Sequence, residues 1–257
     1  MLGQVVNMKW LSSDIICMVI QSEQLALSLP GQFVNMKCGH SLNAYLRRPI
    51  SICRVDKHHM TADIVFQIRG EGTAQLAKTK QGEMADYMGP LGTPFRFADK
   101  GKKVVVIGGG IGVFPLLGLL ESMPDVHRTA LLGFRNKESI VMESEFAQAS
   151  DQLKIATDDG SYGTHGFVTS ILHEHLKQDR PDIVYVCGPT LMMKAVTEMC
   201  LKDDIDVQVS MEQRMGCGVG ACLVCACKKK TDDDYTYTHV CKEGPVFDGK
   251  DILFDDI

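Results

Sequence analysis

Four cysteines near the C-terminus restrict how this part of the chain can fold. They follow the pattern C-x4-C-x2-C-x15-C and are Cys217, Cys222, Cys225 and Cys241. The spacings between the first three cysteines match the plant-type [2Fe–2S] pattern, in which one loop wraps closely over the inorganic sulfides. Gly216, Gly218 and Gly220 suit such a loop, because glycine permits positive φ and lets backbone N–H groups approach the sulfurs. The spacing therefore predicts a [2Fe–2S] cluster.

Two other interpretations of these cysteines stay open. Cys222 and Cys225 alone have the spacing of a zinc knuckle, and the four residues could also be unliganded thiols. We favour the cluster because zinc sites rarely use a glycine-rich loop with an x4 spacing. Cys227 is a fifth candidate, but the plant-type spacing does not use it, so we interpret it as a non-ligand.

The chain has ten cysteines among 257 residues. Its N-terminus lacks the basic region, long apolar run and cleavage site of a secretory signal, which predicts a cytoplasmic protein with reduced thiols. Disulfides are therefore not expected. Four scattered cysteines are predicted to be buried hydrophobes: Cys17, Cys38, Cys53 and Cys200.

Charge and hydropathy argue against nucleic-acid and membrane partners. The formal net charge is −5, and the one lysine run, 228–230, is followed at once by three aspartates at 232–234. The longest uncharged stretch, 104–120, is shorter than a membrane-spanning helix and is interrupted by glycines and Pro115. We expect neither nucleic acid nor membrane as a partner.

The hydrophobic pattern divides the chain into three predicted domains. Residues 1–98 contain short β-branched segments separated by turns, which predict an antiparallel β-barrel or sandwich. Residues 99–210 alternate apolar strands with helices, which predicts a doubly wound parallel sheet. Residues 211–257 form a small cysteine-rich module with little periodicity. Strands are expected at 15–20, 32–36, 50–55, 62–68, 104–107, 129–134, 153–157 and 183–187, and helices at 114–122, 144–149, 166–176 and 190–201.

A glycine turn follows the first predicted strand of the second domain. Gly108, Gly109, Gly110 and Gly112 lie between this strand and a helix, a position where helix N–H groups can approach phosphate. The match to a dinucleotide fingerprint is incomplete, because Val113 replaces the last glycine and Arg135 follows the next strand instead of an acid. A plain tight turn is an equally good interpretation of this feature alone.

Three further short motifs are typical of nucleotide-binding sites. Cys187, Gly188 and Pro189 end another strand of the same sheet, at the edge where ligands of α/β sheets bind. In the first domain, an arginine motif at 48–51 and a glycine turn at 70–73 could together hold a pyrophosphate. Singly, each could be a surface charge or a loop.

The order of these motifs carries a family resemblance. Arg-Pro-Ile-Ser at 48–51, Gly-Glu-Gly-Thr at 70–73, Gly-Pro-Leu-Gly at 89–92, the glycine turn, Cys-Gly-Pro and the cysteine loop follow in series. This series resembles the ferredoxin–NADP reductase superfamily and, more closely, the electron-transfer subunits of NAD-dependent dihydroorotate dehydrogenase B. The most specific matches are 212–225, Val-Cys-Lys-Glu-Gly-Pro-Val-Phe at 240–247 and Thr-Asp-Asp-Gly-Ser at 157–161.

The resemblance implies FAD on the first domain and NAD on the second. The implied FAD residues are Arg48, Pro49, Ile50, Ser51, Val65, Phe66, Gln67, Gly72 and Thr73. The implied NAD residues are Gly108, Gly109, Gly110 and Gly112 near the phosphates, and Cys187, Gly188 and Pro189 near the nicotinamide. Family members often have arginine where this chain has Gln67, so one charge contact to the flavin differs.

The resemblance also implies a function and a partner. The partner is an FMN-containing catalytic subunit that oxidises dihydroorotate to orotate in pyrimidine biosynthesis, in a heterotetramer with two of each chain. Electrons would pass from FMN through the cluster and FAD to NAD+, with no side-chain acid or base in this chain. The alternatives are a flavin subunit of another NAD(P)H–ferredoxin oxidoreductase or hydrogenase complex, and a non-catalytic zinc-binding module. His173 and His175, two residues apart on a predicted helix, face different directions and are not expected to share a metal.

Overall fold

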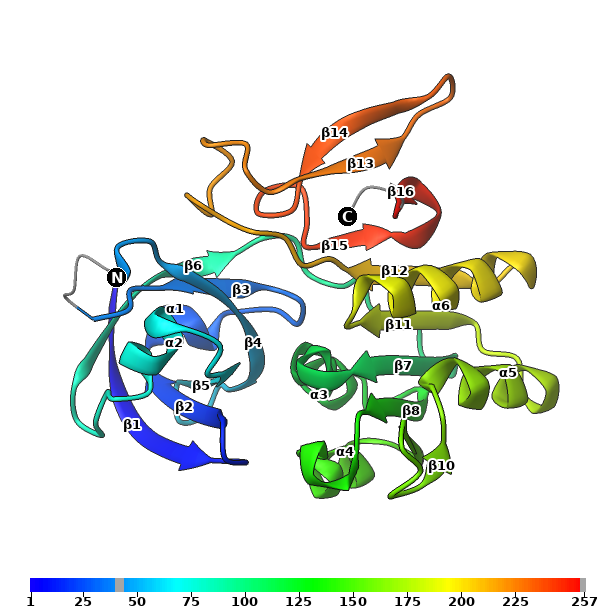
Figure 1. Cartoon of the computed structure of the whole chain (residues 1–257), viewed down its shortest axis with the longest axis horizontal. Helices are drawn as coiled ribbons and strands as arrows, with labels where there is room; N and C mark the ends of the chain where they lie inside the picture. The colour runs from blue at the N-terminus through cyan, green and yellow to red at the C-terminus, as the bar shows by residue number, and fades with distance from the viewer. Residues whose placement is uncertain (40–43, 255–257) are drawn as a thin grey trace.

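The computed structural model describes residues 1–39 and 44–254. It consists of an N-terminal barrel, an α/β domain beside it, and a C-terminal module that lies across one end of both (Figure 1). The antiparallel barrel and the parallel sheet were both predicted from the hydrophobic pattern, and both are confirmed. No helix in the described part of the chain is long and apolar enough to cross a membrane.

The barrel is a closed antiparallel sheet in the order β1-β2-β5-β4-β3-β6. Its elements are β1 (Leu2–Trp10), β2 (Ile15–Gln21), α1 (Glu23–Ala26), β3 (Phe33–Met36), β4 (Arg48–Asp56), β5 (Thr61–Gln67), α2 (Glu71–Leu76) and β6 (Met84–Leu91). Alternate side chains on each strand point inward, as the strand period of two requires, so that Val34, Ile50 and Ile64 share the barrel core. Strands β1 and β6 were not anticipated.

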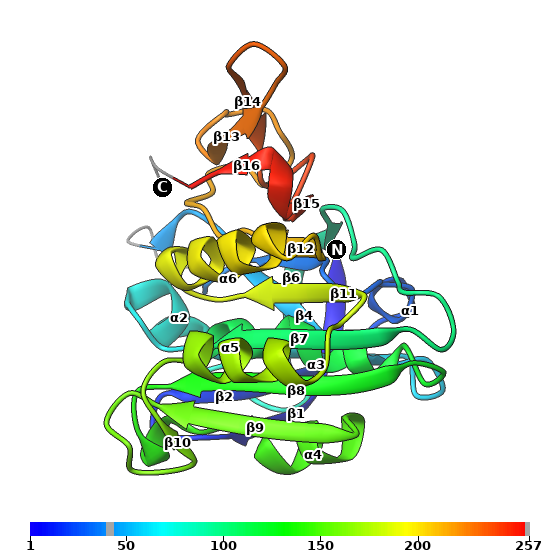
Figure 2. The same ribbon diagram turned by 90° about the vertical axis from the view of Figure 1, so that its right-hand side faces the viewer.

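The α/β domain contains five parallel strands in the order β9-β8-β7-β11-β12, extended at one edge by the short β10. Helices α3 and α4 cover the face towards the barrel, and α5 and α6 cover the other face (Figures 1 and 2). The elements are β7 (Lys103–Gly109), η2 (Gly110–Val113), α3 (Phe114–Glu121), β8 (His127–Phe134), η3 (Lys137–Ser139), α4 (Glu143–Ala149), β9 (Gln152–Thr157), β10 (Thr164–His165), α5 (Val168–Gln178), β11 (Ile183–Cys187), α6 (Thr190–Lys202) and β12 (Asp206–Ser210). The eight strands and four helices expected across the first two domains are confirmed within a few residues at their ends.

The C-terminal module has more regular structure than the sequence pattern indicated. Its elements are β13 (Ala226–Lys230), β14 (Tyr235–His239), β15 (Val246–Asp248), η4 (Gly249–Asp251) and β16 (Ile252–Leu253). Strands β13, β14 and β16 form a small antiparallel sheet whose hairpin projects from the molecule (Figure 2). Strand β15 instead pairs antiparallel with β12 and extends the parallel sheet.

The module is also joined to the end of the barrel. The backbone N–H of Thr93 donates to the carbonyl oxygen of Gly244 at 2.6 Å, and the Thr93 hydroxyl lies 3.1 Å from the carbonyl oxygen of Glu243. A Cβ on Gly92 would lie 2.5 Å from Pro245 Cδ. Two motifs that carried the resemblance, 89–92 and 240–247, therefore pack against each other.

Candidate functional site

Three of the four predicted cluster cysteines lie in the loop before β13 and Cys241 lies in the turn after β14, and backbone N–H groups of both segments point at the cysteine sulfurs. Six N–H groups approach a cysteine Sγ within 3.1–3.4 Å, and all six bonds end on Cys217, Cys222, Cys225 or Cys241. Gly218 and Gly220 have φ of +78° and +80°, as predicted for a loop that turns its N–H groups inward. The Gly220 N–H makes the shortest of the six bonds, to Cys241 Sγ. Thiolates that accept backbone N–H bonds are what an iron–sulfur cluster needs.

The electrostatics of the loop favour thiolate at its exposed end. Backbone N–H bonds, the one from Val219 first, lower the pKa of the Cys217 thiol to about 6. Burial raises the pKa of Cys241 to about 12, so this thiol loses its proton only when metal replaces it. Cys241 and Cys225 are buried, whereas Cys222 is exposed. The site therefore has a solvent side and a protein side.

The zinc interpretation fits this arrangement less well. Among the described residues, no group of three or more His, Cys, Asp or Glu side chains is arranged around a single metal ion. A [2Fe–2S] cluster does not require such a group, because its four cysteines are divided between two irons. Cys227 accepts none of the six N–H bonds and is buried in the strand β13. The four cysteines predicted to be buried hydrophobes are all buried.

In the barrel, the structure brings together two of the predicted FAD motifs. The guanidinium of Arg48, at the start of β4, lies against Gly72 in α2, where an added Cβ would be 2.7 Å from Arg48 Nε. The hydroxyl of Thr73 accepts the backbone N–H of Arg69 at 2.9 Å and so fixes the turn before it. A positive charge thus lies beside a glycine turn, an arrangement suited to a diphosphate.

The side chains of the predicted FAD residues on β4 and β5 point in two directions, either into the protein interior or to the outer face of the barrel. The side chains of Ile50 and Phe66 pack inside the barrel core, and Val65 packs against the α/β domain. Any contact from these three to a flavin would therefore use their backbone. Pro49 and Ser51 lie on the outer face of β4, since they alternate with Ile50.

Gln67 belongs to a hydrogen-bonded chain that sequence reasoning missed. Its amide donates to Asp14 Oδ2 at 2.6 Å, and its Oε1 accepts from Arg69 Nε at 2.7 Å. The bond from Gln67 is the main reason why the pKa of Asp14 is lowered. Gln67 is therefore held between Asp14 and Arg69. Arg69 places a positive charge two residues after Gln67.

The predicted NAD motifs meet at the carboxyl ends of two neighbouring parallel strands. Strand β7 pairs with β11 so that Gly108 lies opposite Cys187. A Cβ on Gly112 would lie 2.5 Å from the Cys187 carbonyl oxygen, and one on Gly109 would lie 2.8 Å from Pro189 Cδ. From β7 the chain continues to β8 on one side, and after β10 it returns to β11 on the other side of β7. The boundary between β7 and β11 is therefore the switch point where open α/β sheets bind ligands.

Cys187 is a neutral residue at this edge. Burial raises the pKa of its thiol to about 12, although a hydrogen bond with Ser210 acts in the opposite direction. The thiol therefore stays protonated at physiological pH. It can contact a ligand but is not a nucleophile.

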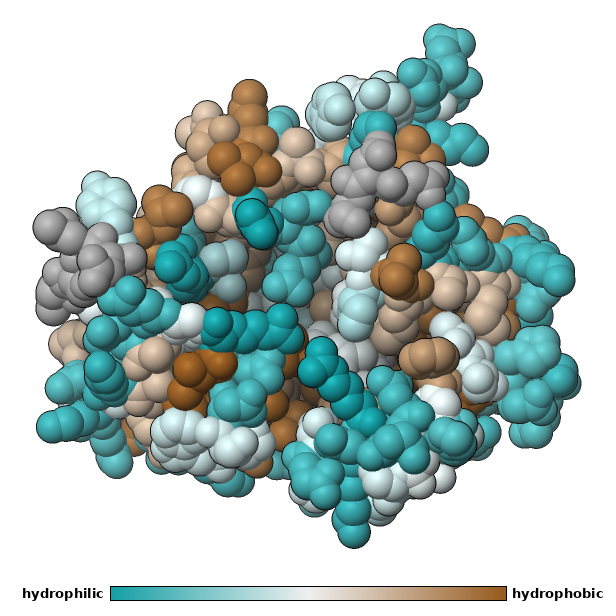
Figure 3. All heavy atoms as spheres, viewed as in Figure 1, coloured by the Kyte–Doolittle hydropathy of each residue, from teal (hydrophilic) through white to brown (hydrophobic). Residues whose placement is uncertain are grey.

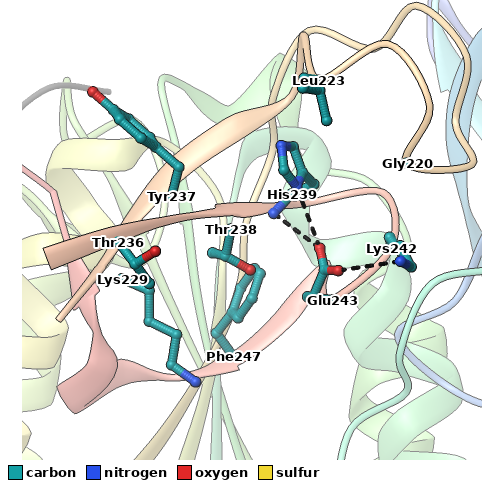
Figure 4. A pocket seen from close by; sticks show the side chains of 10 residues that line it. All are labelled: Gly220, Leu223, Lys229, Thr236, Tyr237, Thr238, His239, Lys242, Glu243 and Phe247. Carbon is teal, nitrogen blue, oxygen red and sulfur yellow. Dashed lines mark hydrogen bonds and ion pairs between the residues drawn. The ribbon is translucent and has the colours of Figure 1, made fainter. Parts of the chain in front are cut away.

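A separate pocket of about 570 Å³ opens beside the C-terminal hairpin. It is lined by Gly220 of the cluster loop and by residues of β14 and the following turn, including His239 and Glu243 (Figure 4). Glu243 accepts a bond from the His239 N–H at 3.0 Å and lies 3.8 Å from Lys242 Nζ. None of the predicted FAD or NAD residues lines this pocket.

Two family models match separate parts of the chain. Residues 106–198 match an oxidoreductase NAD-binding domain, and residues 212–253 match the iron-sulfur cluster binding domain of dihydroorotate dehydrogenase B. The first covers the glycine turn and the Cys-Gly-Pro motif. The second covers all four cluster cysteines.

Similar solved structures have the same fold. A chain of the NADH-dependent reduced ferredoxin-NADP oxidoreductase structure, described for flavin-based electron bifurcation, superposes with a TM-score of 0.88 and 27% identity, over 100% of this chain and 91% of that one. A ferredoxin NADP+ reductase from Neisseria gonorrhoeae with bound FAD and NADP superposes with a TM-score of 0.64 and 18% identity, over 79% and 90% of the two chains.

A curated relative is similar over most of its length. The dihydroorotate dehydrogenase B (NAD(+)) electron transfer subunit of Desulforamulus reducens is 40% identical over 231 residues, which cover 89% of this chain and 88% of the relative. The identity extends across the barrel, the NAD-binding sheet and the cluster loop. The chain therefore belongs to the family of dihydroorotate dehydrogenase B electron transfer subunits.

Proposed function

We propose that this protein is the electron-transfer subunit of NAD-dependent dihydroorotate dehydrogenase, and that it conveys electrons through [2Fe–2S] and FAD to NAD+ in pyrimidine (UMP) biosynthesis. The observation that carries the proposal is the set of six N–H bonds onto the four cysteine sulfurs, in a chain of this family. FAD exchanges one electron or two, so it links a one-electron cluster to NAD+, which accepts a hydride.

Each cofactor is assigned to residues that lie together. The cluster is assigned to Cys217, Cys222, Cys225 and Cys241. FAD is assigned to Arg48, Pro49, Ile50, Ser51, Val65, Phe66, Gln67, Gly72 and Thr73. NAD is assigned to Gly108, Gly109, Gly110, Gly112, Cys187, Gly188 and Pro189. The contact of Arg48 with Gly72 and the contact of Gly112 with Cys187 support the two nucleotide assignments.

The roles of these residues are to bind and to orient. The Arg48 guanidinium supplies charge and paired donors for a diphosphate. The protonated Cys187 supplies a neutral surface, so it neither repels a nicotinamide nor reacts with it. Hydride transfer itself moves no separate proton, and we assign no acid or base in this chain to it. The domains are proposed to be residues 1–98, 99–210 and 211–257.

The family name implies a catalytic partner, which we propose to be an FMN-containing dihydroorotate dehydrogenase subunit in a heterotetramer of two of each chain. Val219, Leu223 and Val224 expose about half of their surface on the cluster loop. Figure 3 shows hydrophobic residues gathered on this part of the molecule. Apolar side chains around the cluster suit an interface that electrons cross. We propose a cytoplasmic location, where the ten free cysteines stay reduced.

Co-expression with an FMN-containing catalytic chain tests the proposal. The expected result is a complex that contains FMN, FAD and iron and reduces NAD+ when dihydroorotate is added. A complex with all three cofactors that is inert to dihydroorotate would contradict the assigned substrate. A colourless chain that contains zinc and no flavin would instead support a zinc-binding module.

A second candidate function has its own observation. The likeness to a chain of NADH-dependent reduced ferredoxin-NADP oxidoreductase extends over the whole protein at 27% identity. On that alternative, the chain would work in an NAD(P)H–ferredoxin oxidoreductase or hydrogenase complex. Reduction of NAD+ by reduced ferredoxin, without a response to dihydroorotate, would favour it. The 40% identity to the Desulforamulus reducens subunit supports the first proposal more strongly.

A further inference from the structure

Asn35 lies where the barrel meets the cluster loop. Its neighbours Val34 and Met36 point into the barrel core, whereas Phe33 belongs to the apolar cluster of the α/β domain and the C-terminal module, which also includes Cys225. Because side chains alternate along a strand, Asn35 faces outward with Phe33. It is nevertheless only 1% exposed.

The same outward face carries part of the proposed FAD site. In the pairing of β3 with β4, Asn35 lies opposite Pro49 and Phe33 lies opposite Ser51. Pro49 and Ser51 face outward because Ile50, between them, packs in the barrel core. Asn35 is therefore the direct cross-strand neighbour of a residue assigned to FAD.

On its other side, Asn35 holds the cluster loop. Its Nδ2 donates to the carbonyl oxygen of Cys217 at 3.3 Å, across 182 positions of the chain. A Cβ on Gly218 would lie 2.7 Å from the same nitrogen, so the loop approaches Asn35 as closely as glycine allows. The guanidinium of Arg47 donates to the backbone oxygen of Asn35 at 3.4 Å and ion-pairs with Asp86 on β6 at 2.8 Å, which fixes the strand beneath.

The other end of the Asn35 amide is buried without a partner. Oδ1 makes no hydrogen bond within the described residues. The amide cannot be turned round, because its NH2 group must face the Cys217 carbonyl, so Oδ1 points away from the loop. An unsatisfied buried acceptor destabilises the folded protein, and an apolar residue of similar size would avoid that cost. Stability alone does not explain an asparagine here.

We propose that Asn35 is a positioning residue that fixes the cluster loop against the flavin-binding strand and so sets the separation between cluster and FAD. This inference rests on the proposed function, because it requires both groups to be bound. Strand β3 is locked to β4 and β6 by its backbone, and the Cys217 carbonyl is tied to β3 by one amide. Without that amide, no hydrogen bond among the described residues ties the Cys217 carbonyl to β3.

The test is Asn35→Leu in the full chain loaded with FAD and cluster. Flavin and iron content should match the wild type, and the melting temperature should be equal or higher because the orphaned oxygen is gone. In stopped-flow reduction by NADH, flavin bleaching should keep its rate. Cluster bleaching should slow severalfold relative to flavin bleaching, because the rate of electron transfer falls as the two centres move apart. The visible circular dichroism of the cluster should also change.

Thr197→Val is the matched control, since Thr197 on α6 is another buried side chain whose oxygen has no partner among the described residues. It should leave both rates and the cluster spectrum unchanged. If Asn35→Leu does not fold, Asn35→Ala is measured in its place. Wild-type cluster bleaching and an unchanged spectrum in the folded variant would overturn the inference. A wild-type chain that binds no FAD or no iron would overturn the proposed function instead.

Discussion

Gly118 of α3 lies directly against the backbone carbonyl of Cys53 on β4, so the barrel and the α/β domain meet without a side chain between them. Around this contact, the apolar core continues from the outer face of the barrel into α3. The two domains proposed for FAD and NAD are thus held together by close packing. The relative position of the two domains therefore depends on Gly118, which has no Cβ.

Gly118→Ala should destabilise the protein. In an ordinary helix the change stabilises by up to about 1 kcal/mol, but here the methyl group would overlap the Cys53 carbonyl, and overpacking typically costs about 1–3 kcal/mol. We expect a lower melting temperature in thermal denaturation. Glu121→Ala is the control at the same interface, because it removes only the 3.4 Å, half-exposed ion pair with Arg54 and should cost less than about 1 kcal/mol. A more stable Gly118→Ala variant would refute the close packing.

Cys222→Ser should remove the cluster absorption and leave FAD bound. Cys222 is exposed, so the substitution changes a proposed ligand without disturbing the core. Iron and flavin content per chain, with the visible spectrum before and after dithionite, measures the outcome. Cys227→Ser is the matched control and should keep its iron, since Cys227 accepts none of the six N–H bonds. Retention of a normal cluster by Cys222→Ser would show that the ligand assignment is wrong.

Arg48→Gln should weaken FAD binding. Loss of a charge-assisted hydrogen bond costs about 1.5–3 kcal/mol, which raises the Kd roughly tenfold to a hundredfold. Titration of the FAD-free chain, followed by flavin fluorescence, gives this value. Lys57→Gln removes the same charge from an exposed turn of the barrel and should not change the affinity. Equal affinities for the two variants would argue against a diphosphate at Arg48 and Gly72.

His175 should make stability depend on pH below about 6.5, the usual pKa of histidine. Burial, and then the charge of Lys154, lower the pKa of His175 in the folded protein. As pH falls through 6.5, the unfolded chain binds a proton that the folded chain does not, so the free energy of unfolding decreases, by at most about 1.4 kcal/mol per pH unit. Urea denaturation between pH 5 and 8, a range of roughly one unit or more on either side of that pKa, should show this decrease.

His175→Gln should lose this part of the pH dependence, whereas His173→Gln should keep it. The two histidines are on one helix and face different directions, as predicted from their spacing; His173 is exposed and His175 is buried. A slope unchanged in His175→Gln would mean that another group causes the pH dependence.

Local sequence patterns determined the types of the elements and the chemistry of the cluster. The apolar runs at 104–107 and 183–187 predicted a parallel sheet, because such strands are buried on both faces only where helices cover both sides of the sheet. The cysteine spacing is equally local, because three of the four proposed ligands lie within nine residues of one another in a single loop. The order of the motifs then indicated the family.

The tertiary structure alone decided how distant segments meet. Asn35 looked like one polar residue in an apolar strand, and only the fold places it between Pro49 and the Cys217 carbonyl. The addition of β15 to the parallel sheet was equally invisible, because a three-residue strand has no periodicity to detect. Sequence spacing indicates contacts along one element, whereas these contacts join different elements, in the case of Asn35 and Cys217 across 182 positions. The sequence by itself therefore identified the cofactors, and the packing of the barrel, the α/β domain and the C-terminal module decided how the residues proposed to hold them are joined.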